Sequence, residues 1–170
     1  MKILFSHGKE SGPWGTKISH LAQIARAQDI ALDSIDYTDS MDPDVRAARL
    51  VELVQAEPNE NFILVGSSMG GYVSMVAGEQ PNVIGLFLMA PALYIPGYAM
   101  QYYAPTPKCI HIVHGWQDEI IPHELSVRFA RRHECSLHLI EGNHRLDSSM
   151  GDLGRLFKLF LAEIWDEVVA

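Results

Sequence analysis

The sequence has 170 residues, of which 48% are hydrophobic and 20% are charged, a composition that fits one globular domain spanning residues 1–170. Its formal net charge of −8, without any basic run, argues against a nucleic-acid partner, because neutralising phosphates requires a face of Lys and Arg. No stretch approaches the roughly 18 apolar residues of a membrane span, and the N-terminal apolar run is too short for a secretory signal, so we expect a cytoplasmic protein without a membrane partner.

Short apolar runs alternate with helical patterns along the chain. Most of the apolar runs carry Ile, Val, Leu and Phe at both odd and even positions, which is typical of strands covered on both faces in a parallel sheet. In chain order the sequence predicts a strand at Lys2–Ser6, a helix at Trp14–Gln28, a strand at Ala31–Tyr37, a helix from Asp42 to about Ala56, a strand at Phe62–Gly66, a helix through Tyr72–Ala77, a strand at Val83–Met89, a strand at Ile110–His114, a helix from Pro122 towards His133, a strand at Leu137–Ile140 and a helix at about Asp152–Val168.

This order of elements predicts the fold class. Alternating strands and helices favour a doubly wound α/β domain, with about six mainly parallel strands and helices on both faces of the sheet. The one long irregular connection, about Pro91–Lys108, is of a length that often carries function. Because ligands of such sheets bind outside the carboxyl ends of the strands, chemistry is expected in the residues that follow each strand.

The clearest chemical motif is G-x-S-x-G at Gly66–Gly70. It follows an apolar strand and precedes a helical pattern, which is the context that a nucleophilic serine requires, and its central position selects Ser68. A glycine-rich turn without chemistry is the alternative interpretation. A phosphate-binding loop is disfavoured because the motif lacks the lysine of such loops.

A serine nucleophile needs a base, and the base needs an orienting acid. Two later strand ends supply candidates, Asp118 in a turn before a helix and His144 in a Gly-Asn-His loop after the last predicted strand. Asp118 ranks above Glu119 and Asp147 as the acid. Among the eight histidines, His144 ranks first as the base; His7 is second, and the others fit strand, helix or structural positions better (His20, His111, His114, His123, His133 and His138).

With these three motifs and the N-terminal strand ending in His7–Gly8, the sequence resembles the α/β-hydrolase superfamily over nearly its whole length. It resembles most the small, cap-less, single-domain bacterial serine hydrolases and esterases. The resemblance implies that Ser68 is the nucleophile, His144 the base and Asp118 the acid. It also implies that a small-molecule acyl ester or thioester is cleaved through an acyl-enzyme intermediate. A C–C or amide hydrolase, and a non-catalytic interaction module with the same fold, stay open as alternatives.

The oxyanion of such a reaction needs backbone donors, for which the N–H groups of Met69 and Lys9 are the candidates. Aromatic residues in loops near the predicted site are candidates for the substrate pocket, with loop packing as the alternative: Trp14, Tyr94, Tyr98 and Trp116.

No metal or organic cofactor is expected. His111 and His114 are three apart on a predicted strand and so point to opposite faces. The dinucleotide motif G-x-G-x-x-G is missing from the sequence. Cys109 and Cys135 form no CxxC pair and are interpreted as reduced thiols.

Overall fold

The computed structural model describes the backbone of residues 1–169 and the side chains of residues 1–167. In this part of the chain, six parallel strands form one sheet in the order β2-β1-β3-β4-β5-β6. The strands are β1 (Lys2–Ser6), β2 (Ala31–Ile35), β3 (Phe62–Ser67), β4 (Val83–Met89), β5 (Cys109–Gly115) and β6 (Ser136–Ile140). The helices are α1 (Thr16–Arg26), α2 (Pro43–Ala56), α3 (Met69–Ala77), α4 (His123–His133) and α5 (Met150–Val169), with a short 3-10 helix, η1 (Asp147–Ser149). The predicted doubly wound parallel sheet is confirmed.

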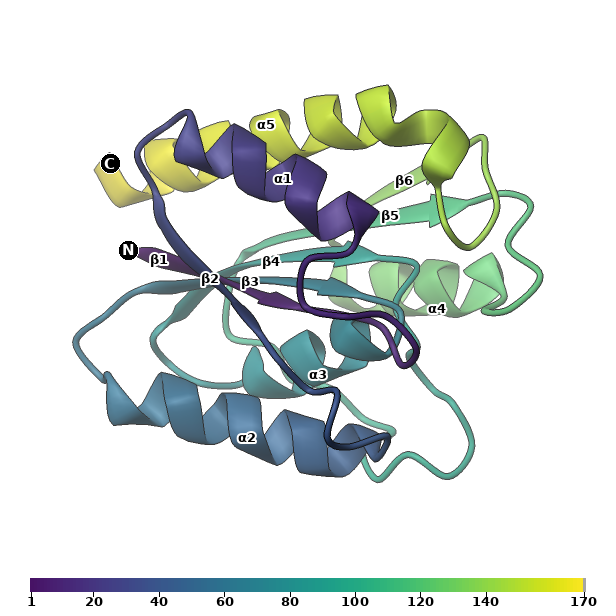
Figure 1. Ribbon diagram of the computed structural model, residues 1–170, viewed down its shortest axis with the longest axis horizontal. Helices are drawn as coiled ribbons and strands as arrows, with labels where there is room; N and C mark the ends of the chain where they lie inside the picture. The colour runs from purple at the N-terminus through teal and green to yellow at the C-terminus, as the bar shows by residue number, and fades with distance from the viewer. Residues whose placement is uncertain (170) are drawn as a thin grey trace.

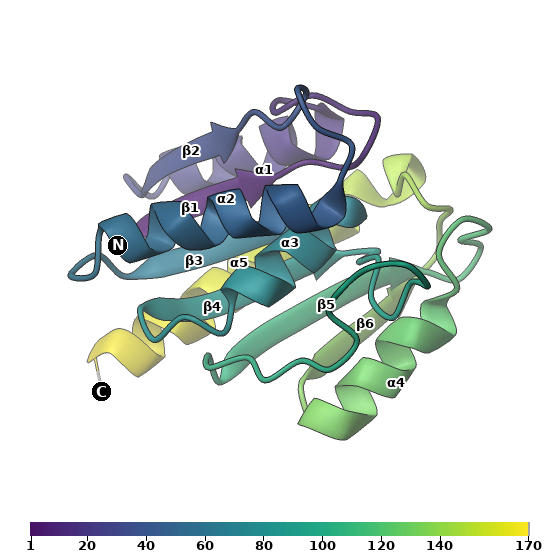
Figure 2. The ribbon, with the colours of Figure 1, turned by 90° about the horizontal axis from the view of Figure 1, so that it is seen from below.

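Helices cover both faces of the sheet (Figure 1). α1 and α5 pack over one face, where Phe5 of β1 and Phe157 of α5 belong to one buried apolar cluster. α2, α3 and α4 lie across the other face, where Leu4 and Phe129 belong to a second cluster (Figure 2). Adjacent residues of a strand point to opposite faces, so burial of both faces explains the apolar residues at both odd and even positions.

Several predicted boundaries differ from the structure by one or two residues, as in α1, which was predicted at Trp14–Gln28 and is Thr16–Arg26. Two of the differences have a clear structural cause. The strand predicted at Ala31–Tyr37 ends at Ile35, where its pairing with Ser6 of β1 stops. The backbone N–H of Tyr37 instead donates to Nε2 of the buried His7 at 3.0 Å. The last helix begins at Met150, before the predicted Asp152, because η1 leads directly into it.

The order of the strands places two loops at a switch point of the sheet. From β1 the chain passes outward to β2 and returns to β3 on the other side of β1. The loops after β1 and β3 therefore meet, and a Cβ built on Gly8 would lie 3.6 Å from Cβ of Ser68. This is the position at which open α/β sheets bind ligands. No helix within residues 1–169 is both long and apolar enough to cross a membrane.

Candidate active site

Ser68 lies in the sharp turn between β3 and α3. Its backbone has φ 56° and ψ −118°, a conformation that is strained for a residue with a side chain and is typical of a nucleophile elbow. The glycines on either side permit the turn. A Cβ on Gly66 would overlap the carbonyl of Gly70, and a Cβ on Gly70 would overlap the carbonyl of Ser6. The G-x-S-x-G spacing is therefore required by close backbone contacts around Ser68.

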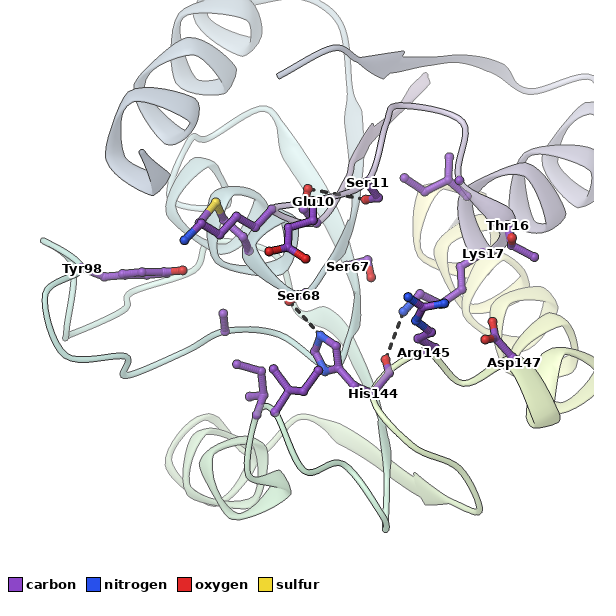
Figure 3. Close-up of a pocket in the computed structure, with 18 residues that line it drawn as sticks. Glu10, Ser11, Thr16, Lys17, Ser67, Ser68, Tyr98, His144, Arg145 and Asp147 are labelled. Atoms are coloured by element: carbon purple, nitrogen blue, oxygen red, sulfur yellow. Dashed lines mark hydrogen bonds between the residues drawn. The ribbon is translucent and has the colours of Figure 1, made fainter. Parts of the chain in front are cut away.

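Three side chains that are remote in sequence form one hydrogen-bonded chain. Nε2 of His144 lies 3.0 Å from Oγ of Ser68 (Figure 3). Nδ1 of the same ring lies 2.8 Å from Oδ2 of Asp118. A carboxylate only accepts, so Nδ1 carries the proton and Nε2 is free to accept the serine proton. This arrangement can activate a hydroxyl as a nucleophile.

The carboxylate of Asp118 is fully buried and accepts four hydrogen bonds. Its Oδ1 accepts from the N–H groups of Ile120 and Ile121, both at 2.9 Å. Its Oδ2 accepts from His144 and, at 3.0 Å, from Nε2 of His114. Burial alone would raise the pKa of Asp118, but the hydrogen bonds from Ile121, His144 and Ile120 outweigh it and hold this pKa below its usual value. The acid therefore stays ionised at neutral pH.

A second histidine, His114, also binds the Asp118 carboxylate, a contact that no sequence motif predicted. Its Nε2 also lies 2.9 Å from the carbonyl of Ile121, so Nε2 carries a proton, while Nδ1 lies 2.8 Å from Oγ of Ser126. Burial is the main cause that lowers the pKa of His114, so this ring stays neutral. The side chain thus holds the acid in place without adding charge.

Replacing His114 by leucine should slow turnover while leaving substrate binding nearly unchanged. The variant loses a hydrogen bond to an ionised group, a contribution of about 1.5–3 kcal/mol, which corresponds to a decrease of roughly ten- to a hundredfold if it acts on the transition state. Steady-state kinetics would separate kcat from KM, and thermal unfolding would verify the fold. An unchanged kcat would mean that Asp118 is held in place without His114.

The loop after β1 supplies the second candidate donor to an oxyanion. Met69 and Lys9 both line the cavity above Ser68. Within the described part of the chain, neither backbone N–H donates a hydrogen bond to another residue. The helix N-terminus at Met69 also favours negative charge nearby. The two residues whose N–H groups were proposed from the sequence thus line the same cavity as Ser68.

A buried arginine binds the backbone of this loop. Arg46 of α2 is fully buried and donates to the carbonyls of Gly8 at 3.1 Å, Lys9 at 3.2 Å and Ser40 at 2.6 Å. Nδ1 of His7 also lies 2.7 Å from the carbonyl of Gly8. Because these donors bind the carbonyls, the loop backbone is fixed in one orientation.

Replacing Arg46 by methionine should lower both stability and turnover. The carbonyls of Gly8, Lys9 and Ser40 would lose a charged donor, and a hydrogen bond to a charged group contributes about 1.5–3 kcal/mol. Denaturant unfolding would measure the loss of stability. A lower kcat would show that the loop after β1 no longer holds its backbone in the orientation that catalysis needs. Arg49→Met is the matched control, since Arg49 lies on the same helix in an exposed ion pair with Asp39, and such pairs contribute about 0–1 kcal/mol. Equal losses in both variants would contradict the role given to Arg46.

A cavity of about 700 Å³ opens above Ser68 and His144. Of the four aromatic residues predicted for the pocket, Tyr98 lines this cavity. The other three pack elsewhere: Trp14 lies under the guanidinium of Arg26, Tyr94 packs on Tyr103 and Arg128, and Trp116 packs on His123. These three rings therefore pack against residues outside the cavity, which was the alternative interpretation for them. Among the described side chains, neither Glu119 nor Asp147, the predicted alternatives for the acid, forms a hydrogen bond with His144.

One group of side chains outside this cavity has ligand atoms suited to a metal. Sγ of Cys109, a ring nitrogen of His111 and a carboxylate oxygen of Glu163 lie within 4.8 Å of one another at the start of β5, whereas Asp118 follows the end of that strand. Their polar atoms pair among themselves, since Glu163 lies 2.8 Å from Nε2 of His111 and 3.8 Å from the thiol. Hydrogen bonds therefore account for this cluster without an ion.

The chain is similar to one protein family model and to several solved structures. A family model described as "Uncharacterised protein family (UPF0227)" matches residues 2–103. A structure from Xanthomonas campestris pv. campestris, described as belonging to the α/β-hydrolase superfamily, is 29% identical, with 95% of this chain and 98% of that chain covered and a TM-score of 0.84. Est1E from Butyrivibrio proteoclasticus is 20% identical over 97% of this chain and 88% of its own, with a TM-score of 0.82. Mouse α/β-hydrolase domain-containing protein 10 is 18% identical over 98% and 90%, with a TM-score of 0.75. No curated protein matches the sequence.

Proposed function

Because the chain belongs to the protein family UPF0227 and has the α/β-hydrolase fold, we propose that it is a serine hydrolase that cleaves small acyl esters or thioesters. The observation that carries the proposal is the continuous hydrogen-bonded chain from Ser68 through His144 to Asp118. The hydrolase class is further supported by the similarity to the Xanthomonas structure.

The proposed reaction proceeds in two steps. His144 takes the proton of Ser68 while Oγ attacks the carbonyl carbon, and the resulting oxyanion accepts hydrogen bonds from the N–H groups of Met69 and Lys9. His144 then returns the proton to the leaving oxygen or sulfur, which departs and leaves an acyl group on Ser68. A water molecule, deprotonated by His144, then attacks the acyl carbon. The bond from this carbon to Oγ of Ser68 breaks, His144 returns the proton to Oγ, and the acid is released. Asp118 stays ionised throughout and orients His144.

A panel of p-nitrophenyl esters of increasing acyl length would test this function. The wild type should release p-nitrophenolate with a burst close to one equivalent of enzyme wherever hydrolysis of the acyl-enzyme is the slower step. A fluorophosphonate probe should label the protein covalently in the same preparation. Folded protein that neither reacts with the probe nor turns over any ester would contradict the proposal and favour an interaction module.

A further inference from the structure

Lys17 lies on the wall of the catalytic cavity. It belongs to the first turn of α1, and its Nζ donates to the carbonyl of His144 at 3.2 Å. The guanidinium of Arg145 lies close to it, and both side chains line the cavity (Figure 3). Figure 3 shows Lys17 and Arg145 on one side of the pair formed by Ser68 and His144, and Tyr98 on the opposite side.

Stability does not explain a lysine at this position. Burial disfavours an ammonium, the positive end of the α1 dipole repels it, and Arg145 adds a like charge. Within the described side chains, Lys17 forms no ion pair with a carboxylate, although Asp147 and Asp118 lie near enough to favour its charge. Asp118 is already engaged by His144, and Asp147 is exposed. Burial lowers the pKa of Lys17 to about 8, so the ammonium is still its main form at pH 7.

A cavity wall with two neighbouring cations suits an anionic ligand. The ammonium has three N–H donors, of which the carbonyl of His144 occupies one, and the guanidinium of Arg145 adds a flat set of donors. Both carboxylates that line the cavity, Glu10 and Asp147, are exposed to solvent, which weakens their repulsion of a bound anion.

We propose that the cavity accepts esters or thioesters whose alcohol or thiol part carries an anionic group, which Lys17 and Arg145 bind. The inference rests on the proposed serine hydrolase function. It assigns the anion to the leaving part because His144 must protonate the leaving atom, so that this part of the substrate lies on the side of His144, next to Arg145 and Lys17. Lys17 and Arg145 are thus residues that determine substrate specificity.

Two esters that differ only in one carboxylate would test the proposal. These are 2-nitrophenyl butanoate, which is neutral, and 3-butanoyloxy-4-nitrobenzoate, whose leaving group carries a carboxylate. Comparing each variant with the wild type on both esters cancels the difference in their intrinsic reactivity. For Lys17→Met, the ratio of kcat/KM for the anionic ester to that for the neutral ester should fall about tenfold at pH 7. Lys17→Arg should retain most of the preference.

Lys108→Met is the control, because it removes the same charge from an exposed position outside the cavity. It should leave the ratio unchanged. Thermal unfolding provides a second readout. Since the folded pKa of Lys17 lies below its unfolded value, the ammonium opposes folding at pH 7, and Lys17→Met should raise Tm. An equal loss of activity on both esters would overturn the proposal, because Lys17 would then act only through the backbone of His144.

Binding without catalysis separates this proposal from the proposed function. Calorimetry with 4-nitrobenzoate and its neutral counterpart 4-nitrobenzamide should show tighter binding of the anion by the wild type, and loss of that difference in Lys17→Met. If the wild type hydrolyses neither ester, the hydrolase proposal fails. The calorimetric comparison would still show whether the cavity binds an anion through Lys17. Equal binding of the two compounds by the wild type would overturn the anion site.

Discussion

Ser68→Ala should abolish covalent labelling by a fluorophosphonate probe and reduce ester turnover by on the order of 10⁶-fold, as loss of the nucleophile does in the serine protease subtilisin. The variant lacks the oxygen that lies 3.0 Å from Nε2 of His144, and this is the atom that would attack the substrate. Residual catalysis would come only from binding and from the oxyanion donors.

The fold should survive this substitution. The backbone N–H of Ser68 donates to the carbonyl of Met89, and its carbonyl accepts from the N–H groups of Gly71, Tyr72 and Ala92; alanine retains all four bonds. Thermal unfolding should therefore give nearly the wild-type Tm. The matched control is Ser67→Ala, which removes the adjacent hydroxyl and should leave labelling intact. Labelling of Ser68→Ala at the wild-type rate would show that another residue is the nucleophile.

Asp118→Asn should retain the fold and lower kcat by about 10⁴-fold. Oδ1 of the new amide can still accept from Ile120 and Ile121. Its NH₂ group, however, would then face two N–H donors, those of His144 and His114. The ring of His144 would have to carry its proton on Nε2, where it cannot accept the proton of Ser68.

Two further measurements sharpen this prediction. Glu119→Gln alters an exposed neighbour and should keep the wild-type kcat, so a similar loss in both variants would contradict the choice of acid. The pH dependence of stability has a defined sign. Because the folded pKa of Asp118 is lowered, its carboxylate stabilises the fold above the unfolded pKa of about 3.9. The difference in unfolding free energy between wild type and Asp118→Asn should therefore shrink as the pH falls below about 4.

Much of the fold could be predicted because its signals are local. Apolar runs at both parities predicted buried strands, and Asp42 followed by Pro43 predicted the start of α2, where the Asp42 carboxylate accepts from the N–H of Asp44 at 2.8 Å. Each signal involves residues only a few positions apart. The early end of β2 was missed because a contact from His7, 30 residues away, withdraws Tyr37 from the sheet.

Some residues of the candidate site could be predicted from local sequence signals, and others could not. The turn of Ser68 and the segments of Asp118 and His144 could be chosen from sequence, because each follows an apolar strand and the carboxyl ends of parallel strands meet at one edge. The bonds of His114 to Asp118, of Arg46 to the loop at Gly8 and of Lys17 to His144 could not. The positions of Trp14, Tyr94 and Trp116 outside the cavity likewise had no local signal.

The sequence alone therefore determined the succession of strands and helices along the chain. It also determined the three segments that carry the Ser68, Asp118 and His144 side chains. Only the tertiary structure decided which side chains support these three, which line the cavity and what charge its wall carries. The physical reason is range: hydrophobic periodicity and turn motifs act over a few residues. By contrast, a hydrogen bond between Lys17 and His144 spans 127 positions and depends on how the start of α1 packs against the loop after β6.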